Sequence, residues 1–158
     1  MYHRPSLMFD EGRWKCWFDY WSGKSVAIGY AQCPADSFLE PAGWRVVRAG
    51  EHPLQENWPN PDVVKVGKKY YSYSDPAGFG HHRWTGRRIC EAVSDDGIKW
   101  EVLGNIPPES DTPATHVPEA FVMQENGKTK IILFYSCQIG GEPYRFEYDR
   151  IRYMWRYE

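Results

Sequence analysis

The chain has 158 residues, 42% of them hydrophobic, which is enough for one compact domain with its own core. Its formal charge of −2 provides no overall basic surface for nucleic acid, and no apolar run reaches the ~18 residues needed to span a bilayer. We therefore expect no nucleic-acid or membrane partner and, since no apolar segment follows the first five residues to form a signal peptide, a cytoplasmic location.

The first predicted unit covers residues 3–50 and contains four short strands. Apolar residues alternate with polar ones or run continuously, as they do in strands, between segments rich in Gly and Asp. The strands are expected at residues 6–9, 14–20, 26–32 and 44–47, with a turn at residues 10–12.

The second predicted unit covers residues 58–104 and follows the same pattern. Its strands are expected at residues 62–66, 70–74, 88–94 and 99–103. Asp95, Asp96 and Gly97 form the turn before the last strand, because Gly supplies positive φ and Asp can bond to its own backbone. Four antiparallel strands in about 45 residues is the size of one β-propeller blade.

The third predicted unit covers residues 116–158 and is incomplete. Strands are expected at residues 120–124, 130–136 and 149–155, with a turn at residues 125–127, and a fourth strand would have to come from the N-terminus or from another chain. Helical patterns are almost absent. Residues 51–57 are the one segment expected to form a turn of helix, and the Pro-rich stretches 53–61 and 107–118 are expected to be loops.

The three units recur at a nearly constant spacing. Pro5 and Pro61 are 56 residues apart, and Pro61 and Pro118 are 57 apart. Each proline is followed by a polar residue, an apolar run, a Gly-containing turn and an aromatic strand, which indicates a repeat architecture. The predicted fold is a single all-β domain, residues 1–158, built as a β-propeller-like array of about three four-stranded antiparallel blades, the last one incomplete.

The segments RPSLMFDEGRWKCWFDYWSG, NPDVVKVGKKYYSYSDP and VPEAFVMQENGKTKIILFYS together resemble the five-bladed β-propeller glycosidases, the broad group around glycoside hydrolase families 43, 62, 32, 68 and 130. The most specific motif is SDDGIKW at residues 94–100. It is similar to the S-x-DG-x-x-W turn of that group, a relative of the sialidase Asp-box. This turn caps the outer hairpin of a blade and carries no information about substrate.

The resemblance implies that the residues just after the three prolines, Ser6, Asp62 and Glu119, converge on one pocket. Glycoside hydrolysis of the inverting type needs two facing carboxyl groups about 6.5–9.5 Å apart. By motif, Glu119 matches the proton donor of family 43 and Asp62 matches the Asp that orients that donor. Ser6 stands where a further carboxylate would be sought, and the blade that would carry the general base is not among the three units. The alternative is that Asp62 and Glu119 only cap strand-leading turns.

Further substrate-binding candidates lie at the same channel mouth or in a neighbouring loop. His3 and Arg4 would orient a sugar hydroxyl or pair with a carboxylate there. The loop with His81, His82 and Arg83 suits a sugar carboxylate or, as in family 130 phosphorylases, a phosphate. The alternative for this loop is a solvated polar surface.

Two tryptophans and one more histidine complete the candidates. Trp21 and Trp58 lie at strand or loop ends and are the better candidates for stacking on a sugar ring, although packing between blades would explain them equally well. His116 precedes Glu119 by three residues. His81, His82, His116 and Glu119 have the chemistry of metal ligands but lack the spacing of HxH or HExxH, so we expect no metal.

The four cysteines, Cys16, Cys33, Cys90 and Cys137, contain no CxxC pair and are expected to be buried free thiols. Since GxGxxG and GxxxxGK[ST] are both absent, we expect no cofactor.

The leading hypothesis is a glycoside hydrolase-like protein that acts on or binds a carbohydrate, with part of an inverting-type acid/base site. The alternative is a non-catalytic glycan-binding or assembly module that has lost the general base, and a weaker one is a glycoside phosphorylase. Because an unfinished blade exposes strand edges, we also expect a homo-oligomer, most simply a two-fold dimer that completes the open blades.

Overall fold

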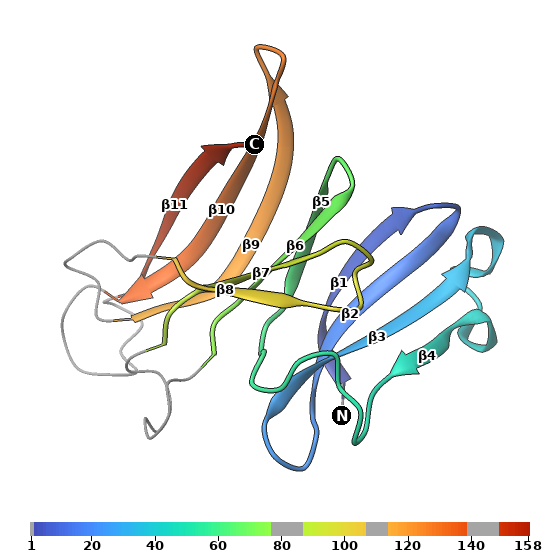
Figure 1. Cartoon of the computed structure of the whole chain (residues 1–158). Helices are drawn as coiled ribbons and strands as arrows, with labels where there is room; N and C mark the ends of the chain where they lie inside the picture. Colours follow the sequence, from blue (N-terminus) through green and yellow to red (C-terminus); the bar gives the residue numbers. More distant parts are fainter. Residues whose placement is uncertain (1, 77–86, 107–113, 139–148) are drawn as a thin grey trace.

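A computed structural model describes residues 2–76, 87–106, 114–138 and 149–158, and it is all-β (Figure 1). Sheet one contains β1 (Tyr2–Asp10), β2 (Arg13–Trp21), β3 (Val26–Pro34) and β4 (Arg45–Arg48). Sheet two contains β5 (Asp62–Val66), β6 (Lys69–Ser74), β7 (Cys90–Ser94) and β8 (Glu101–Asn105). Sheet three contains β9 (Ala114–Glu125), β10 (Lys128–Gln138) and β11 (Asp149–Tyr157).

Each sheet is an antiparallel meander in chain order, and the three sheets follow one another across the molecule (Figure 1). The first strands of the three sheets are neighbours: β1 lies beside β5, and β5 lies beside β9. This is the arrangement of blades around a propeller axis, and it confirms the predicted fold class. Sheet three has three strands in the described residues, and the N-terminal strand belongs to sheet one rather than to sheet three.

Two hairpins connect their strands through two residues that both have positive φ. Glu11 and Gly12 join β1 to β2 with φ of 52° and 74°, and Asn126 and Gly127 join β9 to β10 with φ of 53° and 75°. These are the angles of a type I′ turn, whose twist matches that of the flanking strands. The sequence predicts both turns at these positions.

Several boundaries differ from the predicted ones. Residues 51–57 form no helix; the two helices in the described ranges are short 3-10 turns, Ala35–Ser37 and Pro41–Gly43, neither of which has the length to cross a membrane. Residues 114–118 were expected to be a loop but belong to β9, because they continue the pairing with β10 as far as Ala114 opposite Gln138.

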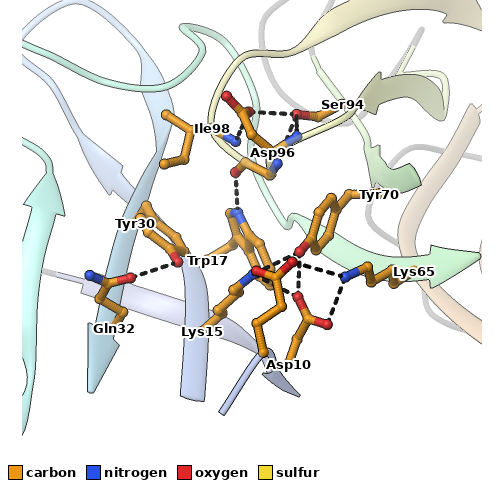
Figure 2. Close-up of polar contacts among 12 residues, drawn as sticks. Asp10, Lys15, Trp17, Tyr30, Gln32, Lys65, Tyr70, Ser94, Asp96 and Ile98 are labelled. Carbon is orange, nitrogen blue, oxygen red and sulfur yellow. Dashed lines mark hydrogen bonds and ion pairs between the residues drawn. The ribbon is translucent and has the colours of Figure 1, made fainter. Parts of the chain in front are cut away.

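The turn between β7 and β8 explains a third difference, since β8 begins at Glu101 and not at residue 99. Asp96 Oδ1 accepts hydrogen bonds from the backbone N–H groups of Ile98 at 2.8 Å and Lys99 at 2.7 Å. The Ser94 hydroxyl accepts from the N–H of Gly97 at 2.9 Å (Figure 2). Because these side chains satisfy the backbone of the turn, the chain cannot enter the ladder before residue 101.

The core between sheets one and two is centred on Trp17. Its ring centroid lies 5.5 Å from that of Tyr30 and 5.9 Å from that of Tyr70, and its Nε1 donates to the carbonyl of Gly97 at 2.8 Å (Figure 2). Gly97 has a φ of +73°, and a Cβ there would lie 2.9 Å from the Trp17 ring. The SDDGIKW turn therefore closes over the tryptophan of the neighbouring sheet and locks the two sheets together.

A second core lies between sheets two and three. Sheet two supplies Val64 and Tyr73, and Ile89 lies directly before β7. Sheet three supplies Ala120, Ile131, Leu133, Tyr135 and Cys137. All four cysteines are free and buried, as predicted, and burial raises the pKa of Cys16 to about 11. Such thiols are packing groups rather than nucleophiles at neutral pH.

An ionic cluster joins sheets one and two at the β1–β2 turn (Figure 2). The buried Lys15 donates to Asp10 Oδ2 at 2.6 Å and to the Tyr70 hydroxyl at 2.7 Å, and Lys65 donates to Asp10 Oδ1 at 2.7 Å. The Tyr70 hydroxyl also donates to Asp10. Burial alone would raise the pKa of the Asp10 carboxyl, but these hydrogen bonds outweigh it and hold the pKa well below its ordinary 3.8.

This cluster predicts a pH dependence of stability. Because the pKa of Asp10 is lower in the folded protein than in the unfolded chain, its stabilisation is present above about pH 4 and is lost as the pH falls further. Asp10→Asn should cost about 2 kcal/mol at pH 7, the size of a hydrogen bond to a charged group. Between pH 6 and 2.5 its unfolding free energy should fall less steeply than that of the wild type. Denaturation at several pH values measures both curves; Asp95→Asn, at an exposed position, is the control, and parallel curves for wild type and Asp10→Asn would contradict the assignment.

Candidate functional site

Three residues at equivalent places in the three sheets adopt left-handed backbone angles. Arg4, Asn60 and Val117 have φ of 49°, 50° and 51°, and each directly precedes a proline at the start of the first strand of its sheet. Positive φ is uncommon outside glycine and is a genuine outlier for a β-branched valine. Backbone strain of about 1–3 kcal/mol per residue persists only where the surroundings impose it, and it is typical of functional sites.

A buried aspartate from the preceding sheet holds two of these strained residues. Asp19 Oδ2 accepts the backbone N–H of Asn60 at 3.0 Å, and Asp75 Oδ2 accepts the N–H of Val117 at 3.0 Å. The Asn60 side chain then donates to Asp75 Oδ1 at 2.5 Å. Asp19 therefore connects sheet one to sheet two, and Asp75 connects sheet two to sheet three, by the same type of bond.

Two other predicted site residues, Ser6 and Asp62, form a second set of such bonds. The buried Ser6 hydroxyl donates to Asp62 Oδ1 at 2.8 Å and accepts the N–H of Val63 at 2.9 Å. Asp62 Oδ2 accepts the N–H of Ala120 at 2.5 Å. The structure thus brings Ser6 and Asp62 together, beside the backbone of Glu119–Ala120, and uses both oxygens of Asp62 as hydrogen-bond acceptors.

A cavity of about 280 Å³ lies beside the start of β1 and the residues just before β5. It is lined by His3, Arg4, Asp19, Val26, Pro59, Asn60 and Arg87. The exposed His3 donates through Nδ1 to the buried Asp19, which orients its ring at the rim. The cavity lining therefore contains two hydrogen-bond donors, Arg4 and His3, and one buried carboxylate, that of Asp19.

Asp75 lies beneath this cavity and is completely buried. Arg87 donates to Asp75 Oδ2 at 3.2 Å, and together with the donors from Asn60 and Val117 it favours the charged form. Burial is the larger effect and raises the pKa of Asp75 above its ordinary value. Arg87 is held by this carboxylate, so its guanidinium has a defined position on the cavity wall.

Glu119 lies on β9, opposite Phe134 of β10, and it is exposed. It does not line the cavity with His3 and Arg4, and no hydrogen bond or ion pair joins its carboxylate to another residue of the described ranges. In the single chain, the predicted proton donor and the predicted substrate-orienting residues therefore lie on different sheets.

The two tryptophan candidates have opposite environments. Trp21, at the end of β2, is 64% exposed, so its ring is available to a ligand. Trp58 is 3% exposed, donates from Nε1 to the Ser72 hydroxyl at 2.9 Å and belongs to the core between sheets one and two. Its ring has no open face for a sugar. Trp58 therefore packs between blades, which is the alternative role considered for it above.

The remaining candidates are histidines and one arginine. His116 lies on β9 opposite Ser136 and is half-buried. His81, His82 and Arg83 lie outside the described residues. In the described ranges, no three His, Cys, Asp or Glu side chains are grouped as a metal site would require.

The sequence-based candidates miss Asp19, Asn60, Asp75 and Arg87. Asp19 and Asp75 are 56 residues apart, the spacing of Pro5 and Pro61. Asp19 lies two residues before the end of β2, and Asp75 directly follows β6. The 56-residue repeat alone identifies these two aspartates as equivalent residues of neighbouring units. Arg87 has no such signal, since it lies between strands and becomes part of the site through Asp75.

No protein-family model matches the chain, and no curated protein matches it. Solved structures, in contrast, match the chain. An N-acetylgalactosamine deacetylase from F. plautii, solved with blood group B trisaccharide, matches 97% of this chain and 49% of its own, with a TM-score of 0.65 and 15% identity. A family GH32 β-fructofuranosidase from Bombyx mori matches 93% of this chain and 32% of its own, with a TM-score of 0.62 and 15% identity.

A thermostable family-43 glycoside hydrolase matches 87% of this chain and 42% of its own, with a TM-score of 0.60 and 12% identity. The chain therefore spans about half the length, or less, of these structures. The expected resemblance to the five-bladed propeller glycosidases is confirmed for the fold. Identities of this size say nothing further about activity.

Proposed function

We propose that this protein binds a carbohydrate in the cavity beside His3, Arg4 and Arg87 and acts on it as a glycoside hydrolase. The observation that carries the proposal is the cavity itself. It lies where strained strand starts, buried carboxylates and a fixed arginine converge. Its volume of about 280 Å³ is close to the lower end of ligand pockets, ~300 Å³, and suits one sugar residue.

The polar groups of the cavity match the chemistry of a sugar. Hydroxyl groups need donors and acceptors at fixed positions, which Arg4, His3 and Asn60 supply. Trp21 lies on β2 two residues beyond Asp19 and offers an exposed aromatic face for the apolar C–H face of a neighbouring sugar residue.

In this proposal Glu119 is the proton donor and Asp62 positions it. Glu119 is exposed and free of bonds in the described ranges, as a group that must reach a glycosidic oxygen needs to be. Asp62 accepts the backbone N–H of Ala120, so it fixes the middle of β9, from which Glu119 projects. We include a homo-oligomer in the proposal, in which a second copy would supply the general base that Ser6 does not.

The second candidate function is a non-catalytic glycan-binding module. Two observations favour it: Ser6 occupies the equivalent position in sheet one where a third carboxylate would be sought, and both Asp62 oxygens are already engaged in hydrogen bonds. Such a protein would retain the cavity and the aromatic face but would have no turnover. A phosphorylase using His81, His82 and Arg83 is a third and weaker alternative.

A panel of aryl glycosides and oligosaccharides separates these functions. We expect at least one sugar to bind, measured by calorimetry, and to be hydrolysed at a rate independent of phosphate. Binding should weaken at least tenfold in Arg4→Ala and stay unchanged in Arg45→Ala, an exposed arginine on the outermost strand of the same sheet. Binding without turnover would favour the module, phosphate-dependent turnover the phosphorylase, and no binding to any sugar would refute the proposal.

A further inference from the structure

The cavity beside His3 contains one cationic side chain that no carboxylate holds. Two of its three basic side chains contact a buried carboxylate: Arg87 donates to Asp75 Oδ2 at 3.2 Å, and His3 donates to Asp19. Arg4 is the third, and in the described ranges no hydrogen bond or ion pair joins its guanidinium to another residue. Because arginine is always protonated in proteins, Arg4 brings a positive charge to the cavity that is open to a ligand.

The backbone of β1 places Arg4 at the cavity. Between the pairs that His3 and Ser6 make with β2, the register shifts, and Arg4 and Pro5 form a bulge of two residues opposite one. The φ of Arg4 is 49°, and the ring of Pro5 fixes the φ of the residue that follows. Bulges redirect a side chain relative to a regular strand, and here Arg4 lines the cavity. The fold therefore determines where the chain presents this charge.

The cavity also has an apolar part, formed by Val26 and Pro59. Val26 pairs with Trp21 in the β2–β3 ladder, so their side chains lie on the same face of sheet one, and the Trp21 ring is mostly exposed. An inorganic anion has no use for these groups, whereas a sugar has C–H faces that pack on apolar side chains and aromatic rings. The lining therefore suits a sugar that also has a negative charge.

The buried Asp19 limits how much negative charge the cavity accepts. Its carboxylate belongs to the same lining, where it accepts the N–H of Asn60 at 3.0 Å and the donor of His3. A dianion such as phosphate would bring two negative charges toward this carboxylate, and like charges repel strongly where water is partly excluded. A monoanion matches the single charge of Arg4. A carboxylate is the monoanion whose two oxygens suit the planar fork of a guanidinium.

We infer that the sugar residue bound in this cavity is a uronic acid, in which a carboxylate replaces the hydroxymethyl group of a neutral hexose. The carboxylate pairs with Arg4, and the sugar ring packs on Val26 and Pro59. The next sugar residue of the glycan stacks on Trp21. This inference rests on the carbohydrate site of the proposed function and names the class of sugar that the site selects.

The two basic side chains that contact carboxylates have different roles in this inference. Asp75 holds Arg87, so Arg87 adds positive potential to the cavity wall at a defined place. His3 donates through Nδ1 to Asp19, so a neutral His3 ring presents Nε2 as an acceptor for a sugar hydroxyl. Recognition of hydroxyl groups distinguishes a uronic acid from a simple carboxylate such as acetate.

Matched methyl glycosides test the charge of the sugar. Methyl glucuronide and methyl galacturonide differ from methyl glucoside and methyl galactoside only in the carboxylate. In NMR titrations at low ionic strength, at least one uronide should bind about tenfold more tightly than its neutral partner, the effect of one hydrogen bond between charged groups. It should also shift the ring signals of His3, which are assigned by their absence in His3→Gln. Added salt should reduce the preference, because Arg4 is exposed.

The outcomes of these titrations separate the two proposals. Neutral glycosides that bind as tightly as the uronides, or more tightly, would overturn this inference and leave the carbohydrate proposal standing. Binding of no sugar at all would refute the carbohydrate proposal and this inference with it.

Variants of Arg4 identify the charge that selects the uronide. Arg4→Gln keeps hydrogen-bond donors but removes the charge, so the uronide should then bind about as weakly as its neutral partner. Arg4→Lys keeps the charge without the planar fork and should retain part of the preference. Arg45→Gln, at an exposed arginine on the outermost strand of the same sheet, is the matched control and should retain all of it. A full preference in Arg4→Gln would overturn the inference.

Simple anions and a sulfated sugar complete the test. Acetate has the carboxylate without the ring, inorganic phosphate has the larger charge, and methyl glucoside 6-sulfate has a different monoanion on the same ring. Each should bind more weakly than the uronide. Tighter binding of acetate or phosphate would indicate an anion site that does not recognise a sugar, and tighter binding of the 6-sulfate would indicate a sulfated sugar. Either result would overturn the inference.

Discussion

Glu119→Gln is expected to lower kcat for an unactivated glycoside by about 10²–10⁴-fold, the contribution of a positioned general acid. Glutamine keeps the size and the carbonyl acceptor of glutamate but has no proton to give to the leaving oxygen. The same variant should lose much less activity toward a dinitrophenyl glycoside, whose leaving group departs without protonation. Steady-state kinetics on the two substrates measures the difference.

The matched control for this variant is Glu101→Gln, which changes an exposed carboxylate on β8, away from the cavity, and should leave both rates unchanged. Equal losses toward both leaving groups would mean that Glu119 positions the substrate or supports the fold, and not that it donates a proton.

Trp17→Ala should destabilise the protein by about 3–5 kcal/mol, the cost of removing a buried large aromatic side chain. Trp17 is inaccessible to solvent and lies between sheets one and two, where its indole contacts Tyr30 and Tyr70 and donates to Gly97. The variant would lose the ring and would leave the Gly97 carbonyl without its donor. Chemical denaturation followed by circular dichroism measures the loss.

Trp21→Ala is the control, because the same substitution on the same strand removes a ring that is mostly exposed. It should change the free energy of unfolding by no more than about 0.5 kcal/mol. Trp17→Phe should lower the free energy of unfolding by about 1–3 kcal/mol, between the losses of the two alanine variants. It keeps an aromatic ring but leaves the Gly97 carbonyl buried and unpaired. Equal stabilities for Trp17→Ala and Trp21→Ala would contradict the assigned core.

The elements of this fold depend on local pattern, which is why the sequence predicts them well. The eleven strands of the described residues each overlap a predicted strand, because alternation of apolar residues and Gly-containing turns act over a few residues. The type I′ turns at Glu11–Gly12 and Asn126–Gly127 follow from the same local chemistry. The exceptions, such as the late start of β8, arise where side chains such as Asp96 compete with the ladder for backbone N–H groups.

The sequence identifies only part of the candidate site. The spacing of the prolines locates Ser6, Asp62 and Glu119 at equivalent positions, and the structure brings Ser6 and Asp62 into one hydrogen-bonded set. The sequence-based candidates leave out Asp75, although the 56-residue repeat pairs it with Asp19, and the sequence holds no signal for Arg87. The sequence also gives no reason to separate Trp21 from Trp58, since both are tryptophans near a strand or loop end. Their different exposure depends on which sheet faces which, a property of the packed molecule.

By itself, the sequence determined the strands, their order, the tight turns and the 56- and 57-residue period, because these result from backbone preferences and from residues close together in the chain. Only the tertiary structure decided which carboxylates are bonded between sheets and which side chains line the cavity. It also decided that Glu119 lies apart from His3 and Arg4. These properties depend on contacts between residues more than 40 positions apart, such as Asp19 with Asn60 and Asp62 with Ala120, which exist only once the sheets have packed.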